Sequence, residues 1–155
     1  MAAFRFPLQK VLEHREEEER QSALSLAHAR REAERARRAL QDLHAAQAAG
    51  RAELAAAHGA GGSVGHLQNL AFVVERLEGQ IRKVNSQCRK AEAEVGRSME
   101  CYRAASRERL RIDQLRTRRL EQWRTQEAQS EQKAMDEVAL TRHQRAGSSK
   151  EREEG

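Results

Sequence analysis

The stretch His58-Gly-Ala-Gly-Gly-Ser-Val-Gly-His66 decides the fold, because it carries four of the nine glycines in a chain of 155 residues. Glycine readily adopts positive φ and is costly inside a helix, so this stretch predicts a turn. Both flanks are rich in the helix formers Ala, Glu, Arg, Leu and Gln, and the single proline, Pro7, suits the first turn of a helix. We predict a helix over 7–58, a turn over 59–66 and a helix over 67–143.

Apolar residues recur in alternating steps of four and three on both sides of the turn, which is the pattern of a coiled coil. Before the turn, the steps that begin at Leu8 meet few large polar residues. After the turn the pattern is unbroken over eight positions: Leu70, Val74, Leu77, Ile81, Val84, Cys88, Ala91 and Val95. The predicted fold class is therefore all-α, a long antiparallel two-helix coiled-coil hairpin with unequal arms.

The composition agrees with long helices rather than a globular core, since 34% of residues are charged, 3% are aromatic and the mean hydropathy is -0.92. Residues 1–145 are predicted to form a single hairpin domain, and the polar segment 146–155 a disordered tail. No apolar run approaches the roughly 20 residues of a membrane-spanning helix, and the N-terminus lacks the features of a signal peptide. We expect a cytoplasmic protein.

The register of the hairpin follows from its turn. Straight antiparallel helices folded near residue 62 bring together residues whose numbers sum to about 125. This register places Leu26 opposite Met99. It also places the acidic run Glu16–Glu19 opposite a segment with three arginines: Arg107, Arg109 and Arg111.

The same register leaves the longer helix unpaired from Arg118 to about His143, over about 38 Å. This overhang has no predicted partner within the chain. It carries large apolar residues that an isolated exposed helix has little reason to keep, namely Trp123, Met135 and Val138.

We expect no enzymatic activity, because the carboxylates, serines and thiols are scattered along two helices without a protected cleft. None of the six histidines stands four residues from another, and the glycine-rich turn lacks the Gly-Lys-Ser/Thr ending of a nucleotide loop. Cys88 and Cys101 lie 13 residues apart on one predicted helix and cannot bridge. No catalytic, metal or cofactor site is predicted.

An arginine-rich strip runs from Arg97 to Arg124, with nine arginines against four acidic residues. Such a strip can hold a phosphate backbone or dock onto an acidic protein surface. Its acidic residues are interspersed, and a hairpin differs from the parallel dimer of a basic zipper, so the nucleic-acid reading is the less favoured alternative.

Phe72 and Val73 fall beside the apolar stripe instead of within it, so some of this apolar surface is expected to face outward. Inner packing explains one or two residues of this region. The remainder could bind a partner, and both readings stay open.

Two terminal motifs carry a resemblance to a known family. The opening Phe4-Arg-Phe-Pro-Leu-Gln-Lys-Val-Leu-Glu-His-Arg-Glu-Glu-Glu-Glu19 and the late Gln132-Lys-Ala-Met-Asp-Glu-Val138 resemble the bacterial flagellar export protein FliJ family. The resemblance covers residues 4–142. It implies a coiled coil similar to the central stalk of rotary ATPases.

The resemblance further implies a cytoplasmic adaptor of the flagellar type III export apparatus, held at the inner membrane at the flagellar base through its partners. Those partners would be the hexameric export ATPase, the membrane export-gate protein and the export chaperones. The residues expected at the ATPase are Leu8, Val11, Leu12, Trp123, Met135, Asp136, Glu137 and Val138. The residues expected at the gate lie near the turn: Leu43, Ala46, Gly50, Val73, Leu77, Gln80 and Val84.

Two other functions remain compatible with the residues alone. One is a generic coiled-coil scaffold or chaperone unrelated to flagella. The other is the arginine-rich nucleic-acid binder. The oligomeric state is open, because a helix with an exposed apolar stripe can also self-associate.

Overall fold

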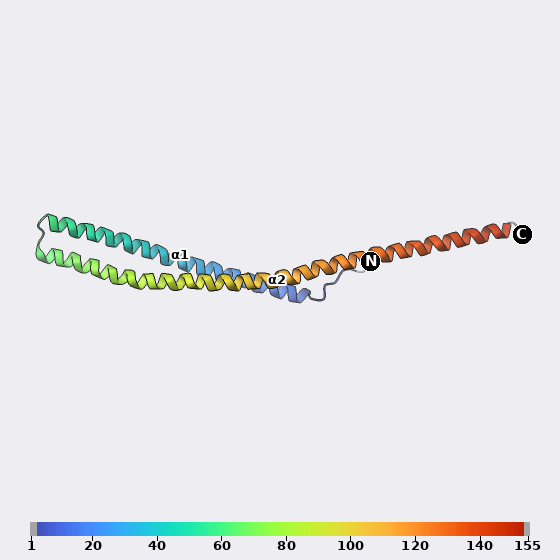
Figure 1. The fold of residues 1–155 in the computed structure, drawn as a ribbon, viewed down its shortest axis with the longest axis horizontal. Helices are drawn as coiled ribbons and strands as arrows, with labels where there is room; N and C mark the ends of the chain where they lie inside the picture. Colours follow the sequence, from blue (N-terminus) through green and yellow to red (C-terminus); the bar gives the residue numbers. More distant parts are fainter. Residues whose placement is uncertain (1–2, 154–155) are drawn as a thin grey trace. The chain divides into compact units, whose positions relative to one another are not determined.

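The computed structural model describes residues 3–153, with side chains described as far as Arg145. It contains two helices, α1 (Gln9–Gly59, 51 residues) and α2 (Val64–Glu153, 90 residues), as Figure 1 shows. No strand occurs among the described residues. The prediction of an all-α hairpin with unequal arms is confirmed.

The turn is shorter than the predicted 59–66, because both helix ends are capped by local hydrogen bonds. At the end of α1, Gly61 has φ of 71°, and the amide of Gly62 donates to the carbonyl of Ala57 at 2.9 Å. This is the glycine C-cap that satisfies the last carbonyl groups of a helix. At the start of α2, the Ser63 hydroxyl oxygen accepts a hydrogen bond from the amide of His66 at 3.3 Å, so the helix begins at Val64.

The far end of α2 lies at Glu153, ten residues beyond the predicted end at 143. The helix therefore passes through most of the segment 146–155 that we predicted as a disordered tail, and residues 154–155 lie outside the described part. The single glycine of this segment, Gly147, costs a helix only about 1 kcal/mol, and no proline follows to end it.

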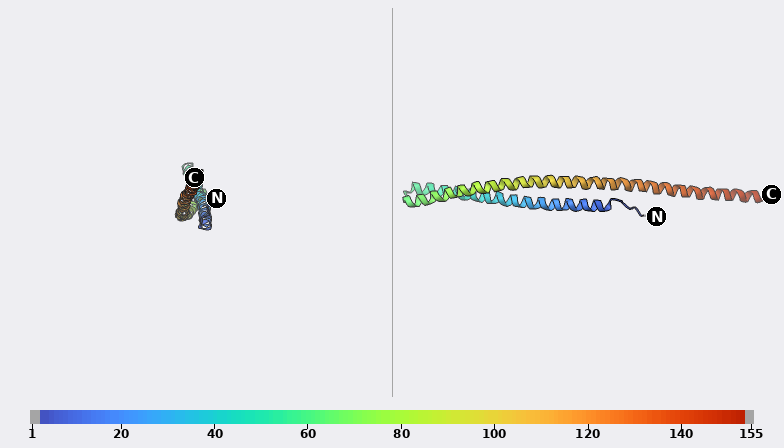
Figure 2. Two further views of the ribbon diagram at one scale, coloured as in Figure 1. Left: turned by 90° about the vertical axis from the view of Figure 1, so that its right-hand side faces the viewer. Right: turned by 90° about the horizontal axis from the view of Figure 1, so that it is seen from below.

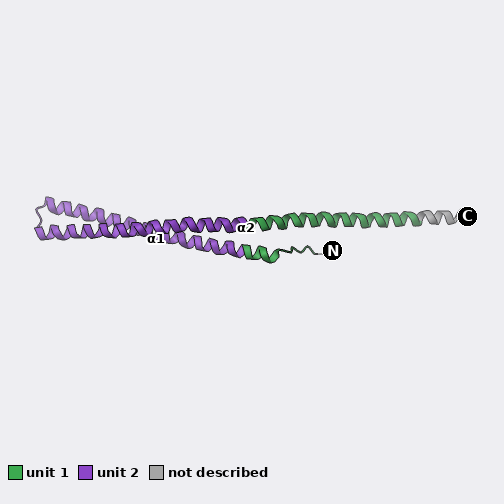
Figure 3. Ribbon diagram, turned by 60° about the horizontal axis from the view of Figure 1, so that its bottom comes forward, with its two compact units in different colours: residues 1–15, 108–155 green, residues 16–107 purple. Residues whose placement is uncertain are grey.

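The chain divides into two compact units, and each unit contains a part of both helices. Unit 1 comprises Met1–Arg15 with Glu108–Gly155, and unit 2 comprises Glu16–Arg107 (Figure 3). The predicted hairpin domain over 1–145 spans both units.

In unit 2 the two helices run antiparallel, side by side from the turn onward (Figure 2). Leu26, Ala29 and Ala33 of α1 are buried, and small residues there let the helices approach closely. The eight predicted positions of α2 all lie on the protected face, with Val74 and Cys88 buried and the other six half-buried. The buried Ser98 continues this face, and its hydroxyl donates to Glu94 at 3.4 Å.

Polar pairs flank the apolar contact and fix its register. Arg37 Nε donates to Glu92 at 3.0 Å, and Arg51 pairs with Glu78 at 2.7 Å. The numbers in each pair sum to 129, within about one helical turn of the predicted 125. The pKa of the Arg37 guanidinium is raised by its hydrogen bond to Glu92 and by the attraction of that carboxylate. Exposed pairs of this kind fix geometry more than they add stability.

The predicted match between Glu16–Glu19 and the three arginines stays a prediction. Within these segments Glu17 pairs with Arg20 at 2.5 Å and Glu108 with Arg111 at 2.6 Å, while Glu18, Glu19 and Arg109 also take part in polar interactions.

In unit 1 the N-terminal segment packs against α2. Phe6 and Leu12 are buried, and the rings of Phe4 and Trp123 lie 5.9 Å apart at 52°. Trp123 therefore has a partner within the chain, and the prediction that the overhang begins near residue 118 was wrong. The physical reason is that the chain before Gln9 is not helical, and an extended residue reaches about 3.3 Å where a helical one rises about 1.5 Å. Beyond Glu127, every described side chain as far as Arg145 is exposed.

The first prediction concerns the buried stripe of unit 2. Leu26→Ala should lower the free energy of unfolding by about 2–3 kcal/mol, because it removes buried methyl groups and leaves a cavity between the helices. Leu140→Ala is the matched control. Leu140 is 62% exposed, so its truncation should change stability by less than about 0.5 kcal/mol. Urea unfolding followed by circular dichroism measures both, and equal effects would contradict the assignment of the stripe.

The second prediction concerns the turn. Gly61→Ala should destabilise the chain by about 1 kcal/mol, since an L residue is strained at positive φ. Gly96→Ala, in the interior of α2, should stabilise it by about 0.5–1 kcal/mol, because a Cβ there meets no atom within 4 Å. Thermal unfolding of the two variants should shift in opposite directions. A gain in stability for Gly61→Ala would contradict the C-cap.

Candidate protein-binding surfaces

The candidate sites of the described residues are exposed apolar side chains and shallow grooves along the two helices. Among residues 3–145, no three His, Cys, Asp or Glu side chains gather as a metal-binding group. Cys88 is buried and Cys101 exposed, and both are free. Within the described part of the chain, neither helix has a stretch long and apolar enough to cross a membrane.

The first surface lies on α2 in unit 1, where the predicted ATPase contacts are exposed. Met135 is 71% exposed and Val138 is 51% exposed, and they lie three residues apart on one face of the helix. The intervening Asp136 and Glu137 are also exposed, and Asp136 accepts a hydrogen bond from Gln132 at 3.1 Å. We name Met135–Val138 the terminal surface.

The N-terminal candidates of the same predicted set are not all accessible. Leu12 is 1% exposed and packs inside unit 1, so its side chain serves the fold. Leu8 and Val11 are 36% and 39% exposed. Trp123 is half-buried beneath Phe4, on the wall of a cavity of about 370 Å³.

The other walls of this cavity combine apolar and cationic side chains. Leu8 and Leu115 contribute apolar surface, and Arg5 and Arg119 contribute guanidinium groups. The non-helical N-terminal segment thus packs against α2, and some of the residues expected at the ATPase are partly covered by this packing.

The second surface is a groove in unit 2 between the two helices. Four of the seven predicted gate contacts line it together: Leu43, Ala46, Gln80 and Val84. The groove measures about 660 Å³, and Asp42 and Lys83 place one charge of each sign at its wall. We name it the near-turn groove.

The other three predicted gate contacts differ in exposure. Val73 is 50% exposed, and Leu77 is half-buried in the stripe. A Cβ added at Gly50 would meet Cγ2 of Val74 at 3.3 Å, so Gly50 allows α1 to approach α2 closely. Its role is packing, which leaves little side-chain surface for a partner.

Further apolar residues near the turn point outward. Phe72 is 62% exposed, in line with the expectation that part of this region faces outward, and Val64 is 71% exposed. The sequence analysis placed Val64 in the turn and therefore did not predict it as an exposed apolar residue of a helix. Its position directly after Ser63, a good N-cap residue, was the signal that it begins a helix.

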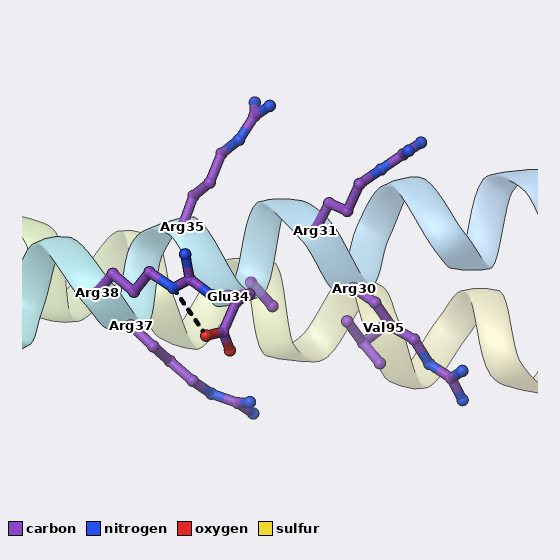
Figure 4. Close-up of a pocket in the computed structure, with 8 residues that line it drawn as sticks. Arg30, Arg31, Glu34, Arg35, Arg37, Arg38 and Val95 are labelled. Carbon is purple, nitrogen blue, oxygen red and sulfur yellow. Dashed lines mark hydrogen bonds and ion pairs between the residues drawn. The ribbon is translucent and has the colours of Figure 1, made fainter.

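An arginine cluster on α1 was also missed. Arg30, Arg31, Arg35, Arg37 and Arg38 fall within nine residues and surround a groove floored by Ala33 and Val95 (Figure 4). The density of arginine in this short segment was the available signal. In the predicted strip of α2, by contrast, several arginines pair with a glutamate three residues before them: Arg97, Arg103 and Arg111. These pairs reduce the charge available to a phosphate backbone.

Comparison with known proteins agrees with the terminal motifs. A family model described as Flagellar FliJ protein matches residues 4–148, which include both motifs, all of α1 and α2 as far as residue 148. No curated protein and no solved structure matches the chain. The extent of the family match, together with the two-helix fold, leads to one assignment: this chain belongs to the FliJ family, and its role lies in flagellar protein export.

Proposed function

We propose that this chain is a non-enzymatic stalk and adaptor of the flagellar export apparatus, which binds the hexameric export ATPase by its terminal surface and the membrane export gate by its near-turn groove. The observation that carries the proposal is the exposure of Met135 and Val138 on a helix where every described side chain from Ala128 to Arg145 is exposed. Family membership supplies the export apparatus as the setting.

The terminal surface has the chemistry of a protein contact. Complete burial of a Met or Val side chain is worth roughly 1.5–3 kcal/mol, and none of the described residues covers these two. Asp136 and Glu137 stand between them and supply charges for the rim of an interface. An ATPase ring that closes around this part of α2 would bury Met135 and Val138. It would place Asp136 and Glu137 where basic groups of the ring can pair with them.

The near-turn groove supports the second contact. Ala46 and Gln80 are exposed, whereas Leu43 and Val84 are half-buried and form the inner wall. A partner that inserts an apolar side chain between Leu43 and Val84 would extend the existing core without unfolding it. Binding of the gate at this groove would hold the chain at the inner membrane through a partner, and export chaperones would reach the apparatus through the same adaptor.

The third prediction tests the terminal surface. Met135→Asp with Val138→Asp should weaken binding to the purified export ATPase at least about tenfold, because two apolar contacts are replaced by charges that lose solvation in the interface. Gln129→Asp with Ser130→Asp introduces the same charges at exposed positions nearby and should bind normally. Calorimetry with the full chain measures all three proteins. Equal affinities would remove the terminal surface from the proposal.

The fourth prediction tests the near-turn groove. Ala46→Arg places a long cation in the groove and should weaken binding to the cytoplasmic part of the gate protein by about tenfold or more. Ala45→Arg is the control, since Ala45 is exposed beside it and does not line the groove. Surface plasmon resonance compares the two. If both variants bound the gate as tightly as the unmodified chain, the groove would not be the gate site.

A further inference from the structure

The cavity between the N-terminal segment and α2 has apolar walls with guanidinium groups beside them. We name it the N-terminal cavity; it measures about 370 Å³ and lies within unit 1. Its apolar surface comes from the rings of Phe4 and Trp123, whose centres lie 5.9 Å apart, and from Leu8 and Leu115. This volume falls in the size range of small ligand pockets, so a side chain of another protein can enter it.

Both segments that form the cavity are held in place. Leu115, Arg119 and Trp123 follow one another at steps of four residues on α2, so they share one face of the helix. In the non-helical segment, Phe6 is only 8% exposed. The carbonyl of Phe6 accepts a hydrogen bond from the amide of Gln9 at 3.1 Å, which ties the segment to the start of α1. The cavity is therefore a product of packing within unit 1.

The positive charge of the cavity is not compensated. Arg5 and Arg119 line it, and none of its ten lining residues is acidic. Neither guanidinium forms a hydrogen bond or an ion pair with another described residue. Elsewhere on α2, by contrast, Arg103 and Arg111 each pair with a glutamate three residues before them. The N-terminal cavity thus offers two cations to an acidic group of a partner.

We propose that the N-terminal cavity binds a segment of the export ATPase in which an apolar side chain stands next to an Asp or a Glu. The apolar side chain packs against Trp123 and Leu115. The carboxylate pairs with Arg5 and Arg119, because the planar fork of a guanidinium group suits a carboxylate. This inference rests on the proposed function, which brings the ATPase to this part of α2, and it adds the chemistry that the ATPase must supply.

The position of the cavity on α2 favours the same partner as the terminal surface. Val138 lies 15 residues after Trp123, about 22 Å along the helix and about 60° around it, since each helical residue rises about 1.5 Å and turns about 100°. A ring that contacts Val138 can therefore reach the cavity on the same side of α2. Leu8 and Trp123, which the sequence analysis expects at the ATPase, both line the cavity.

The shape of the cavity argues against a flat anionic surface. Trp123 is half-buried beneath Phe4, so a lipid bilayer would meet the more exposed side chains around the cavity before it met the indole. A protruding side chain of a protein can enter the cavity and displace its water. The phosphate backbone of a nucleic acid would gain from the arginines but not from the apolar walls. A protein segment uses both features.

The test compares two pairs of arginines in the full chain. Arg5→Gln with Arg119→Gln should weaken binding to the purified export ATPase about tenfold, because charge-assisted hydrogen bonds are lost. Arg116→Gln with Arg118→Gln removes the same charge from exposed positions that do not line the cavity, and should bind as the unmodified chain does. Calorimetry at about 0.05 M and about 0.3 M salt measures all three proteins. The first variant should also show a weaker dependence of affinity on salt.

Trp123 reports on the cavity directly, because it is the single tryptophan of the chain. Its replacement by hydroxytryptophan allows its fluorescence to be excited apart from that of tryptophans in the ATPase. Saturation with the ATPase should shift the emission to shorter wavelength, since an apolar side chain displaces water from the indole ring. Vesicles of phosphatidylglycerol should leave the emission unchanged, because a flat anionic surface does not enter the cavity.

The outcomes separate this inference from the proposed function. If Met135→Asp with Val138→Asp lost affinity for the ATPase while both arginine variants bound equally well, the terminal surface would stand and the N-terminal cavity would be rejected. Binding of the ATPase without a shift at Trp123 would also overturn the inference, as would a shift with the vesicles and none with the ATPase. An unmodified chain that does not bind the ATPase would remove both proposals. Circular dichroism checks that the helices persist in each variant.

Discussion

Two helices that pack along one stripe can bury only a narrow face of each, and this limit governs the whole molecule. Of the described residues, only seven apolar side chains and Ser98 are buried, and Leu12 is the one large side chain among them that is almost completely so. A wider core would need a third element. The remaining surface is consequently mostly polar and exposed to solvent. Many of its charged side chains form local ion pairs, which can exchange for other partners. Stability and function therefore compete for the same few apolar residues.

That competition is visible in the near-turn groove. Leu43 and Val84 follow the stripe that holds the helices together, yet both also line the groove. Half-burial resolves the conflict, because one side of each side chain packs inward and the other remains accessible. Gly50 shows the opposite outcome, because the space that a side chain would fill there is occupied by Val74. Residues expected at one partner thus divide into those whose side chains are accessible and those that serve the packing of the helices.

The sequence predicted most of the fold because a coiled coil is specified by local periodicity. The unbroken steps of four and three from Leu70 to Val95 predict the protected face of α2, and the glycines near residue 61 predict the position of the turn. The N-cap residue Ser63 makes α2 begin earlier than predicted, and the apolar periodicity carries no information about this cap. The contact of Phe4 with Trp123 was missed for a different reason. It depends on how far a non-helical segment reaches, and a register calculated from helical rise alone cannot include that reach.

Exposure and periodicity together explain where the candidate surfaces lie. Met135 and Val138 are apolar side chains that no described residue covers, which is the physical basis of the candidate terminal surface. Leu24 is also exposed, in the middle of α1, but it lies among polar and charged residues instead of in a continuous apolar stripe. A surface of the first kind gains affinity from burial. A surface of the second kind gains orientation from charge, and its strength follows the salt concentration. The chain thus presents an apolar and a charged kind of surface with different physical sensitivities, because burial of apolar side chains is little affected by salt whereas exposed charges are screened by it.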